Sequence, residues 1–139
     1  MDGMRKVNII GAGLSGLTAS ITLASKGVHV NMVSLQNSER AQSVLAEGGI
    51  NGALDVMGDD DSVEEHFQDT MKAGVWLADP EAVKGLTEHA PEIIYWLRDL
   101  GVPFNEENGH LVQRYFGGQK KRRTAFAGLV GDHRLLLDN

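Results

Sequence analysis

The opening of the chain contains stretches with different spacings of apolar residues. Residues 5–10 (RKVNII) contain three apolar residues and stop at a glycine, which predicts a short buried strand. Residues 14–26 carry apolar side chains at helical spacing and are followed by Gly27, a typical helix stop. The apolar stripe of this helix consists of Leu14, Leu17, Ile21 and Ala24. Residues 28–33 (VHVNMV) alternate and predict a second strand, so the three elements form a βαβ unit with parallel strands.

The next part of the chain shows boundary signals more clearly than periodicity. Residues 34–61 are polar and glycine-containing, which predicts a loop. Asp61 and Ser62 are both good N-cap residues, and acidic residues follow within one turn. We therefore expect a helix that begins at one of them and ends at about Leu77.

Prolines and glycines predict the later boundaries. Pro80 follows an aspartate and predicts a second helix start, and Pro91 predicts the start of a third helix that ends at Gly101. The dipeptide at 108–109 (Asn-Gly) lies between short extended runs and indicates a hairpin. We expect the large aromatic side chains of the helical region to lie in the core: Trp76, Tyr95 and Trp96.

Three glycines follow the first strand at the spacing G-x-G-x-x-G: Gly11, Gly13 and Gly16. The first permits a sharp turn, the second lets the backbone approach a pyrophosphate, and the third lets the helix pack closely on the strand. The phosphates would then lie on N–H groups at the helix N-terminus. The flanking strands and helix are the context that dinucleotide binding requires. The second strand normally ends in an acid that binds ribose, but Ser34 and Leu35 stand here, so the motif alone leaves NAD and FAD open.

Charge and composition exclude several classes of protein. A net charge of −6 argues against a nucleic-acid partner, and the basic cluster at 120–123 predicts a solvated loop, with contact to an anionic group as the alternative. The absence of cysteine excludes a disulfide, a thiolate nucleophile and a cysteine-ligated metal. No stretch reaches the roughly 20 apolar residues that cross a bilayer, and the N-terminus does not resemble a signal peptide. We therefore expect a cytoplasmic protein without direct membrane insertion.

Four further stretches carry a resemblance to one family. They are SVLAEGGINGAL (43–54), HFQDTMKAGVWLADPEAV (66–83), APEIIYWLRDLGVPF (90–104) and QRYFGGQKKRRTAFA (113–127). With the glycine loop, they resemble in order and spacing the flavoprotein subunits of fumarate reductase and succinate dehydrogenase, with L-aspartate oxidase as a near relative. The resemblance implies a Rossmann-like α/β fold with a parallel sheet, FAD as cofactor, and an oxidoreductase of electron transport.

The resemblance assigns cofactor contacts to particular residues. The phosphate loop and ribose contacts fall on Gly11, Ala12, Gly13, Leu14, Ser15, Gly16, Ser34 and Leu35. Gly48 and Gly49 match the glycine pair beside the isoalloxazine ring, where backbone amides reach the N5 region, and Ser43 matches a hydroxyl beside the flavin. Gln42 stands where the membrane-bound enzymes carry the histidine that bonds FAD covalently. We therefore expect noncovalent FAD of lower potential, which suits fumarate reduction or an oxidase better than succinate oxidation.

The resemblance also implies a C4 dicarboxylate substrate and an iron–sulfur electron-transfer partner. Phe116 and Gly117 match the F-G-G segment beside the dicarboxylate, although an ordinary core phenylalanine before a turn is an equal alternative. His133 is a further substrate candidate in an altered tail. No catalytic or metal-binding residue is assigned, because the family's catalytic groups lie beyond this chain. One helix face could suggest a metal, but the resemblance gives it packing and hydrogen-bonding roles: Glu65, His66 and Asp69.

The length of the chain limits what it holds. A chain of 139 residues is too short for both an FAD-binding domain and a capping domain. We expect residues 1–127 to be the N-terminal part of an FAD-binding domain, with the capping domain and C-terminal part absent, and residues 128–139 to be a divergent or truncated tail. The predicted function is the FAD-binding portion of a fumarate reductase-like enzyme, not competent alone. The alternatives are a non-catalytic flavin- or partner-binding module, an L-aspartate oxidase-like fragment and, with weaker support, an NAD(P)-binding domain.

Overall fold

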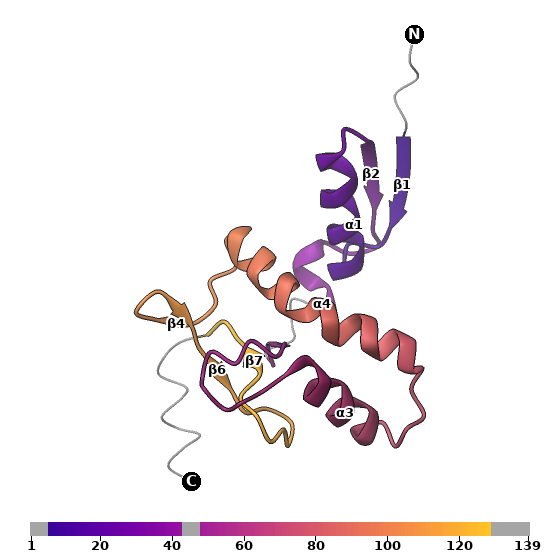
Figure 1. Ribbon diagram of the computed structural model, residues 1–139. Helices are drawn as coiled ribbons and strands as arrows, with labels where there is room; N and C mark the ends of the chain where they lie inside the picture. Colours follow the sequence, from indigo (N-terminus) through magenta and orange to yellow (C-terminus); the bar gives the residue numbers. More distant parts are fainter. Residues whose placement is uncertain (1–5, 43–47, 129–139) are drawn as a thin grey trace. The chain divides into compact units, whose positions relative to one another are not determined.

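The computed structural model describes residues 6–42 and 48–128 (Figure 1). The chain divides into two compact units, Met1–Glu47 and Gly48–Asn139. In the described part of the chain, no helix is both long and apolar enough to span a membrane. The expected division into residues 1–127 and a tail at 128–139 stays a prediction.

The first unit is the predicted βαβ element. Strand β1 (Lys6–Ile10) pairs in parallel with β2 (His29–Val33). Helix α1 (Leu14–Ser25) connects them and lies alongside both strands in Figure 1. It ends where the sequence predicts, because Gly27 takes a φ of +74°, which favours glycine. A short 3₁₀ helix, η1 (Ser38–Arg40), follows β2. The predicted α/β class with parallel strands is therefore confirmed.

The apolar surface of this unit is only partly covered. Ile10 is 91% exposed at the end of β1, and α1 has no buried residue. Three members of the predicted stripe are at least 36% exposed: Leu14, Leu17 and Ile21. The prediction of a buried first strand is thus wrong for the residues that the structure describes, because a pair of strands with one helix offers each side chain few neighbours.

The second unit begins its helical part with α3 (Val63–Ala73). Its N-terminus is as predicted, since the Ser62 hydroxyl accepts a hydrogen bond of 3.1 Å from the Glu65 amide. Its C-terminus comes before the predicted Leu77. The reason lies in the backbone, because Val75 and Trp76 take φ values of +52° and +59° and cannot continue a right-handed helix.

Helix α4 (Pro80–Asp99) is one continuous helix, so the prediction that Pro91 starts a third helix is wrong. Pro91 lacks the N–H that would close a helical hydrogen bond, which costs about 3 kcal/mol in a helix interior. One buried stripe continues on both sides of it: Val83, Thr87, Ala90 and Ile94. Burial of this face outweighs the local loss. The helix ends before Gly101, as predicted, where φ is +97°.

Short antiparallel strands complete the second unit. One sheet has the order β3-β7-β6, from β3 (Ile50–Asn51), β6 (Gln113–Arg114) and β7 (Thr124–Ala125). A hairpin joins β4 (Glu106–Glu107) to β5 (His110–Leu111). Asn108 and Gly109 form its turn with φ values of +53° and +79°, which confirms the hairpin predicted there. Strand β3 lies within the segment predicted as a loop, because a two-residue strand leaves no periodicity to detect.

The core of the second unit lies between α4 and the short strands. Ile94, Leu111 and Ala125 are buried there, with Phe104 packed against them. The predicted core positions of two aromatic residues are wrong. Trp76 is 57% exposed because it lies in the turn between α3 and α4, and Tyr95 is 38% exposed beside the buried Ile94.

Candidate functional site

The predicted phosphate loop connects β1 to α1. Gly11 takes a φ of +107°, which L side chains rarely adopt, and its amide donates to the Val33 carbonyl at 2.8 Å. Gly13 is the N-cap of α1, and the first turn of the helix holds no acidic residue. No carboxylate of that turn therefore repels an anionic ligand at the positive end of the helix dipole.

The third glycine of the motif has the packing role predicted for it. A Cβ on Gly16 would lie 2.1 Å from the carbonyl oxygen of Gly11 and 3.4 Å from Cγ2 of Ile9. Helix α1 therefore lies directly on the backbone of the loop, at a distance that only glycine allows.

A cleft of about 580 Å³ opens beside this loop. Six predicted cofactor residues line it: Gly11, Ala12, Gly13, Ser34, Leu35 and Gln42. Leu14, Ser15 and Gly16 do not line it and lie in or beside the first turn of α1. Ser43 lies outside the described residues. Further lining residues were not predicted: Ile10, Gln36, Asn37, Ser38, Arg40 and Ala41. Among them Arg40 adds a positive charge, and the sequence signal for it is a lone arginine soon after the second strand.

The second predicted flavin segment begins the second unit. Gly49 has a φ of +96°, and a Cβ there would lie 2.4 Å from the Ala125 carbonyl oxygen and 2.9 Å from Cγ2 of Thr124. The backbone of Gly49 is thus pressed against β7. Only glycine satisfies both the conformation and the contact.

The predicted substrate segment lies next to this glycine pair. A Cβ on Gly48 would lie 3.1 Å from the ring of Phe116, and the Arg114 guanidinium donates to the Gly48 carbonyl at 3.3 Å. Phe116 is 50% exposed, so it is not an ordinary core residue. Gly117 follows with a φ of +65° in a turn. The structure therefore brings together the predicted flavin and substrate segments of this unit, while His133 lies outside the described residues.

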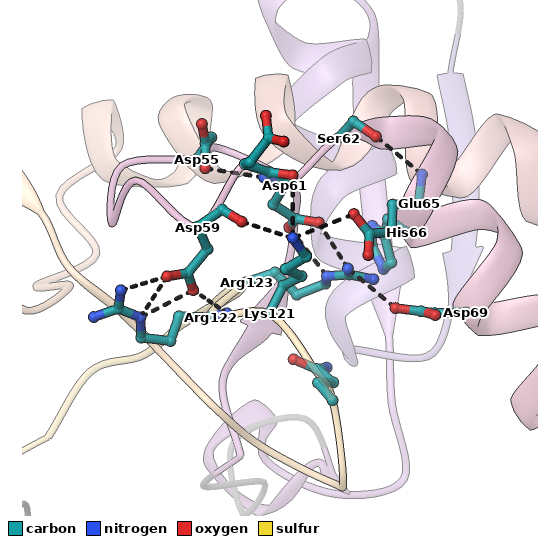
Figure 2. Close-up of polar contacts among 12 residues, drawn as sticks. Asp55, Asp59, Asp61, Ser62, Glu65, His66, Asp69, Lys121, Arg122 and Arg123 are labelled. Carbon is teal, nitrogen blue, oxygen red and sulfur yellow. Dashed lines mark hydrogen bonds and ion pairs between the residues drawn. The ribbon is translucent and has the colours of Figure 1, made fainter.

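An ionic cluster joins the basic residues at 121–123 to the acidic run before α3 (Figure 2). Lys121 donates to the Asp59 carbonyl at 2.6 Å and pairs with Glu65 at 3.6 Å. Arg122 binds the Asp59 carboxylate through its side chain and its amide. These hydrogen bonds lower the pKa of Asp59 to about 2. The predicted solvated loop is thus wrong for these three residues, which are paired with carboxylates.

The innermost member of the cluster is Arg123, which is 1% exposed. It binds both carboxylate oxygens of Asp61, at 3.1 and 2.7 Å, and Asp69 at 3.2 Å. His66 is buried beside it. The pKa of the His66 imidazole is lowered, chiefly because the ring is buried and secondly because the Arg123 charge is close. No group of three histidine or acidic side chains in the described ranges has metal-binding geometry. Asp69 forms an ion pair with Arg123, and the packing and hydrogen-bonding roles expected for this helix face stay a prediction.

The residues of the first unit fit the pyrophosphate and ribose of a dinucleotide. The observations are the first turn of α1 without an acidic residue, the glycine that the loop geometry requires at position 11, and the cleft beside them. Ser34 supplies a hydroxyl and Arg40 a positive charge to that cleft. The chemical capacity of the unit is anion binding by main-chain amides.

Comparison with known proteins gives a family and close relatives. The FAD binding domain family matches residues 6–137. The succinate dehydrogenase flavoprotein subunit of Bacillus subtilis is 44% identical over 129 residues, which is 92% of this chain and 22% of the relative. The fumarate reductase flavoprotein subunit of Mycobacterium tuberculosis is 39% identical over 130 residues, which is 91% of this chain and 22% of the relative. The chain thus spans about a fifth of the length of these relatives.

Solved structures agree with the sequence matches. The Mycobacterium smegmatis Sdh1 complex in the apo form superposes with a TM-score of 0.83 at 33% identity, over 89% of this chain and 21% of that one. The Escherichia coli quinol fumarate reductase FrdA, in a substituted form, superposes with a TM-score of 0.76 at 34% identity, over 88% of this chain and 22% of that one.

Proposed function

Because this chain belongs to the FAD binding domain family, we propose that it forms the N-terminal FAD-binding portion of a fumarate reductase-like flavoprotein. The membership confirms the predicted resemblance and the predicted cofactor, FAD, so the NAD(P) alternative is set aside. The activity, substrate and partners below belong to the proposal.

The observation that carries the proposal is the glycine loop with its cleft. Gly11 makes the turn out of β1, and Gly13 stands where main-chain amides at the start of α1 can bind the pyrophosphate of FAD, with Leu14, Ser15 and Gly16 continuing into the helix. Ser34 would bind the adenosine ribose, and Arg40 would balance phosphate charge.

The second unit would serve the flavin ring and the substrate. Bound FAD supplies hydride transfer between its N5 and a C4 dicarboxylate, fumarate or succinate. The amides of Gly48 and Gly49 would stabilise negative charge near N5 of the reduced ring, and Phe116 would pack on the carbon skeleton of the dicarboxylate. Electrons would come from an iron–sulfur partner protein. The chain would act in the cytoplasm. His133 and Ser43 remain candidate substrate and flavin contacts of the same proposal.

The flavin is proposed to be held noncovalently. Gln42 lines the cleft, and its amide is not a nucleophile that could attach to the ring. Precipitation of the flavin-loaded chain with acid should release all flavin into the supernatant. Flavin retained in the pellet would contradict noncovalent binding.

The second candidate function is a module that binds FAD without turnover. Fumarate-dependent oxidation of a reduced viologen dye by the flavin-loaded chain tests this function: turnover would exclude a module that only binds FAD. Aspartate-dependent oxygen consumption tests the L-aspartate oxidase alternative in the same preparation.

Binding of the FAD pyrophosphate is tested by placing a negative charge at the start of α1. Gly13→Asp places a good N-cap residue there, so α1 stays folded, but the carboxylate repels the pyrophosphate. Gly13→Asn is the matched control, because it caps as well and has the same size without the charge. FAD affinity, measured by flavin fluorescence, should fall at least about tenfold further for Asp than for Asn. FAD affinities that are measurable and equal in the two variants would overturn pyrophosphate binding at this loop.

A further inference from the structure

The side chain of Arg123 is more deeply embedded than its neighbours in the basic cluster. It is 1% exposed, and so is the side chain of Asp61, whose two carboxylate oxygens it binds as a fork. Burial of such a pair carries a large desolvation penalty, so it is weak evidence for stability and calls for another role. Figure 2 shows the guanidinium between Asp61 and Asp69, with His66 alongside.

The main chain of Arg123 is held as firmly as its side chain. Its carbonyl accepts hydrogen bonds from the Gly52 amide and from Nε2 of Gln113, each at 2.8 Å. Gln113 is 3% exposed, and its Nε2 also donates to the Gly52 carbonyl at 2.7 Å. Arg123 therefore contacts three elements at once: the segment after β3, the start of β6 and helix α3.

The strand that starts immediately after Arg123 contacts the glycine pair. Thr124 pairs with Asn51 in the sheet, and its hydroxyl donates to Oδ1 of Asn51 at 2.6 Å. The Ala125 carbonyl and Thr124 Cγ2 are the atoms that leave no room for a Cβ on Gly49. A shift of β7 must therefore move the backbone of Gly49, because packed interiors transmit displacement.

We propose that Arg123 is a positioning residue. Its buried ion pairs hold β7 in place, and β7 in turn keeps the backbone of Gly48 and Gly49 in the conformation that binds the flavin. The proposal rests on the proposed function, because the flavin contact of the glycine pair is part of that function. Arg123 itself touches no reacting atom. It acts through Thr124 and Ala125.

The test compares two neighbouring arginines in the full chain. Arg123→Gln removes the buried cation, and Arg122→Gln is the matched control, because Arg122 also pairs with an aspartate but does so at a half-buried site. In the cofactor-free chain, Arg123→Gln should shift the amide resonances of Gly48 and Gly49. It should also speed exchange of the Gly52 amide at least about tenfold. Arg122→Gln should leave all three unchanged.

Conservative variants separate positioning from folding. Arg123→Lys keeps the charge but loses the two-pronged geometry, and should give intermediate shifts at the same amides. If Arg123→Gln does not fold, Asp69→Asn replaces it, because this change removes one carboxylate partner of Arg123 and leaves Asp61 in place. It should shift the amide resonances of Gly48 and Gly49 by less than is expected for Arg123→Gln. A folded Arg123 or Asp69 variant with unmoved glycine amides would overturn the proposal, and so would equal shifts from Arg122→Gln.

Titration with FAD completes the test. Arg123→Gln should raise the Kd for FAD at least about threefold relative to Arg122→Gln. An equal Kd in the two variants would overturn the flavin part of the proposal. If FAD leaves the Gly11–Gly16 amides of the unsubstituted chain unmoved, the proposed function fails instead. The cofactor-free amide shifts still decide whether Arg123 positions the glycine pair.

Discussion

The carbonyl oxygen of Ala125 lies 2.4 Å from the position that a Cβ on Gly49 would take. This contact joins two segments far apart in the chain, both of which resemble flavin-enzyme motifs. It means that Gly49 is required by packing as well as by its backbone conformation, where φ is +96°.

Gly49→Ala should lower the free energy of unfolding by roughly 3 kcal/mol, because it adds a clash with β7 to the strain of a positive φ. Gly109→Ala is the matched control. It has a φ of +79° and open space around the new methyl group, so it should lose only about 1 kcal/mol. Urea unfolding followed by tryptophan fluorescence measures both, since both tryptophans lie in this unit. Equal losses would show that β7 yields to the methyl group.

Gly16→Ala should disrupt the phosphate loop, because its methyl group would lie 2.1 Å from the Gly11 carbonyl oxygen. The amide resonances of the loop should shift, and FAD affinity should fall at least about tenfold. Gly85→Ala is the control within a helix: nothing lies within 4 Å of the new methyl group, and the change should stabilise α4 by about 0.5–1 kcal/mol. An unaltered loop in Gly16→Ala would contradict the close packing of α1.

Pro91→Ala should stabilise the second unit by about 1–3 kcal/mol, because alanine supplies the missing N–H in the interior of α4 and has a higher helix propensity. Glu92→Ala, at an exposed neighbouring position, should change stability by less than about 0.5 kcal/mol. Thermal unfolding followed by circular dichroism compares the two. A lower Tm for Pro91→Ala would show that packing of the proline ring outweighs the backbone gain.

The stability of the second unit should fall as the pH drops below about 6.5, because of His66. Burial, and after it the Arg123 charge, lower the pKa of His66 in the folded chain, while the Asp61 and Asp69 carboxylates oppose this shift. The unfolded chain therefore takes up a proton at His66 before the folded chain does. The slope is at most about 1.4 kcal/mol per pH unit and vanishes below the folded pKa.

Urea unfolding at several pH values measures this slope, and His66→Gln should flatten it. Asp59 does not interfere, because its pKa of about 2 adds a loss of stability only below its ordinary 3.8. An unchanged slope in His66→Gln would exclude His66 as the group responsible.

Local signals were sufficient for the boundaries of several elements. The parallel βαβ unit, the helix starts at Asp61 or Ser62 and at Pro80, and the turn at Asn108 were all predicted, because each depends on residues within one or two turns of chain. The same locality explains the failures. Pro91 is a local stop signal, and it was overruled by a buried face that extends to Ile94.

The candidate site divides in the same way. The sequence by itself determined the glycine loop between β1 and α1, since Gly11, Gly13 and Gly16 shape the turn that joins this strand to this helix. Only the tertiary structure decided that Gly49 packs on Ala125 and that Arg123 meets Asp61 in a buried pair. Those partners are separated by long loops. Their meeting depends on the packing of whole elements, which no spacing of residues along the chain specifies.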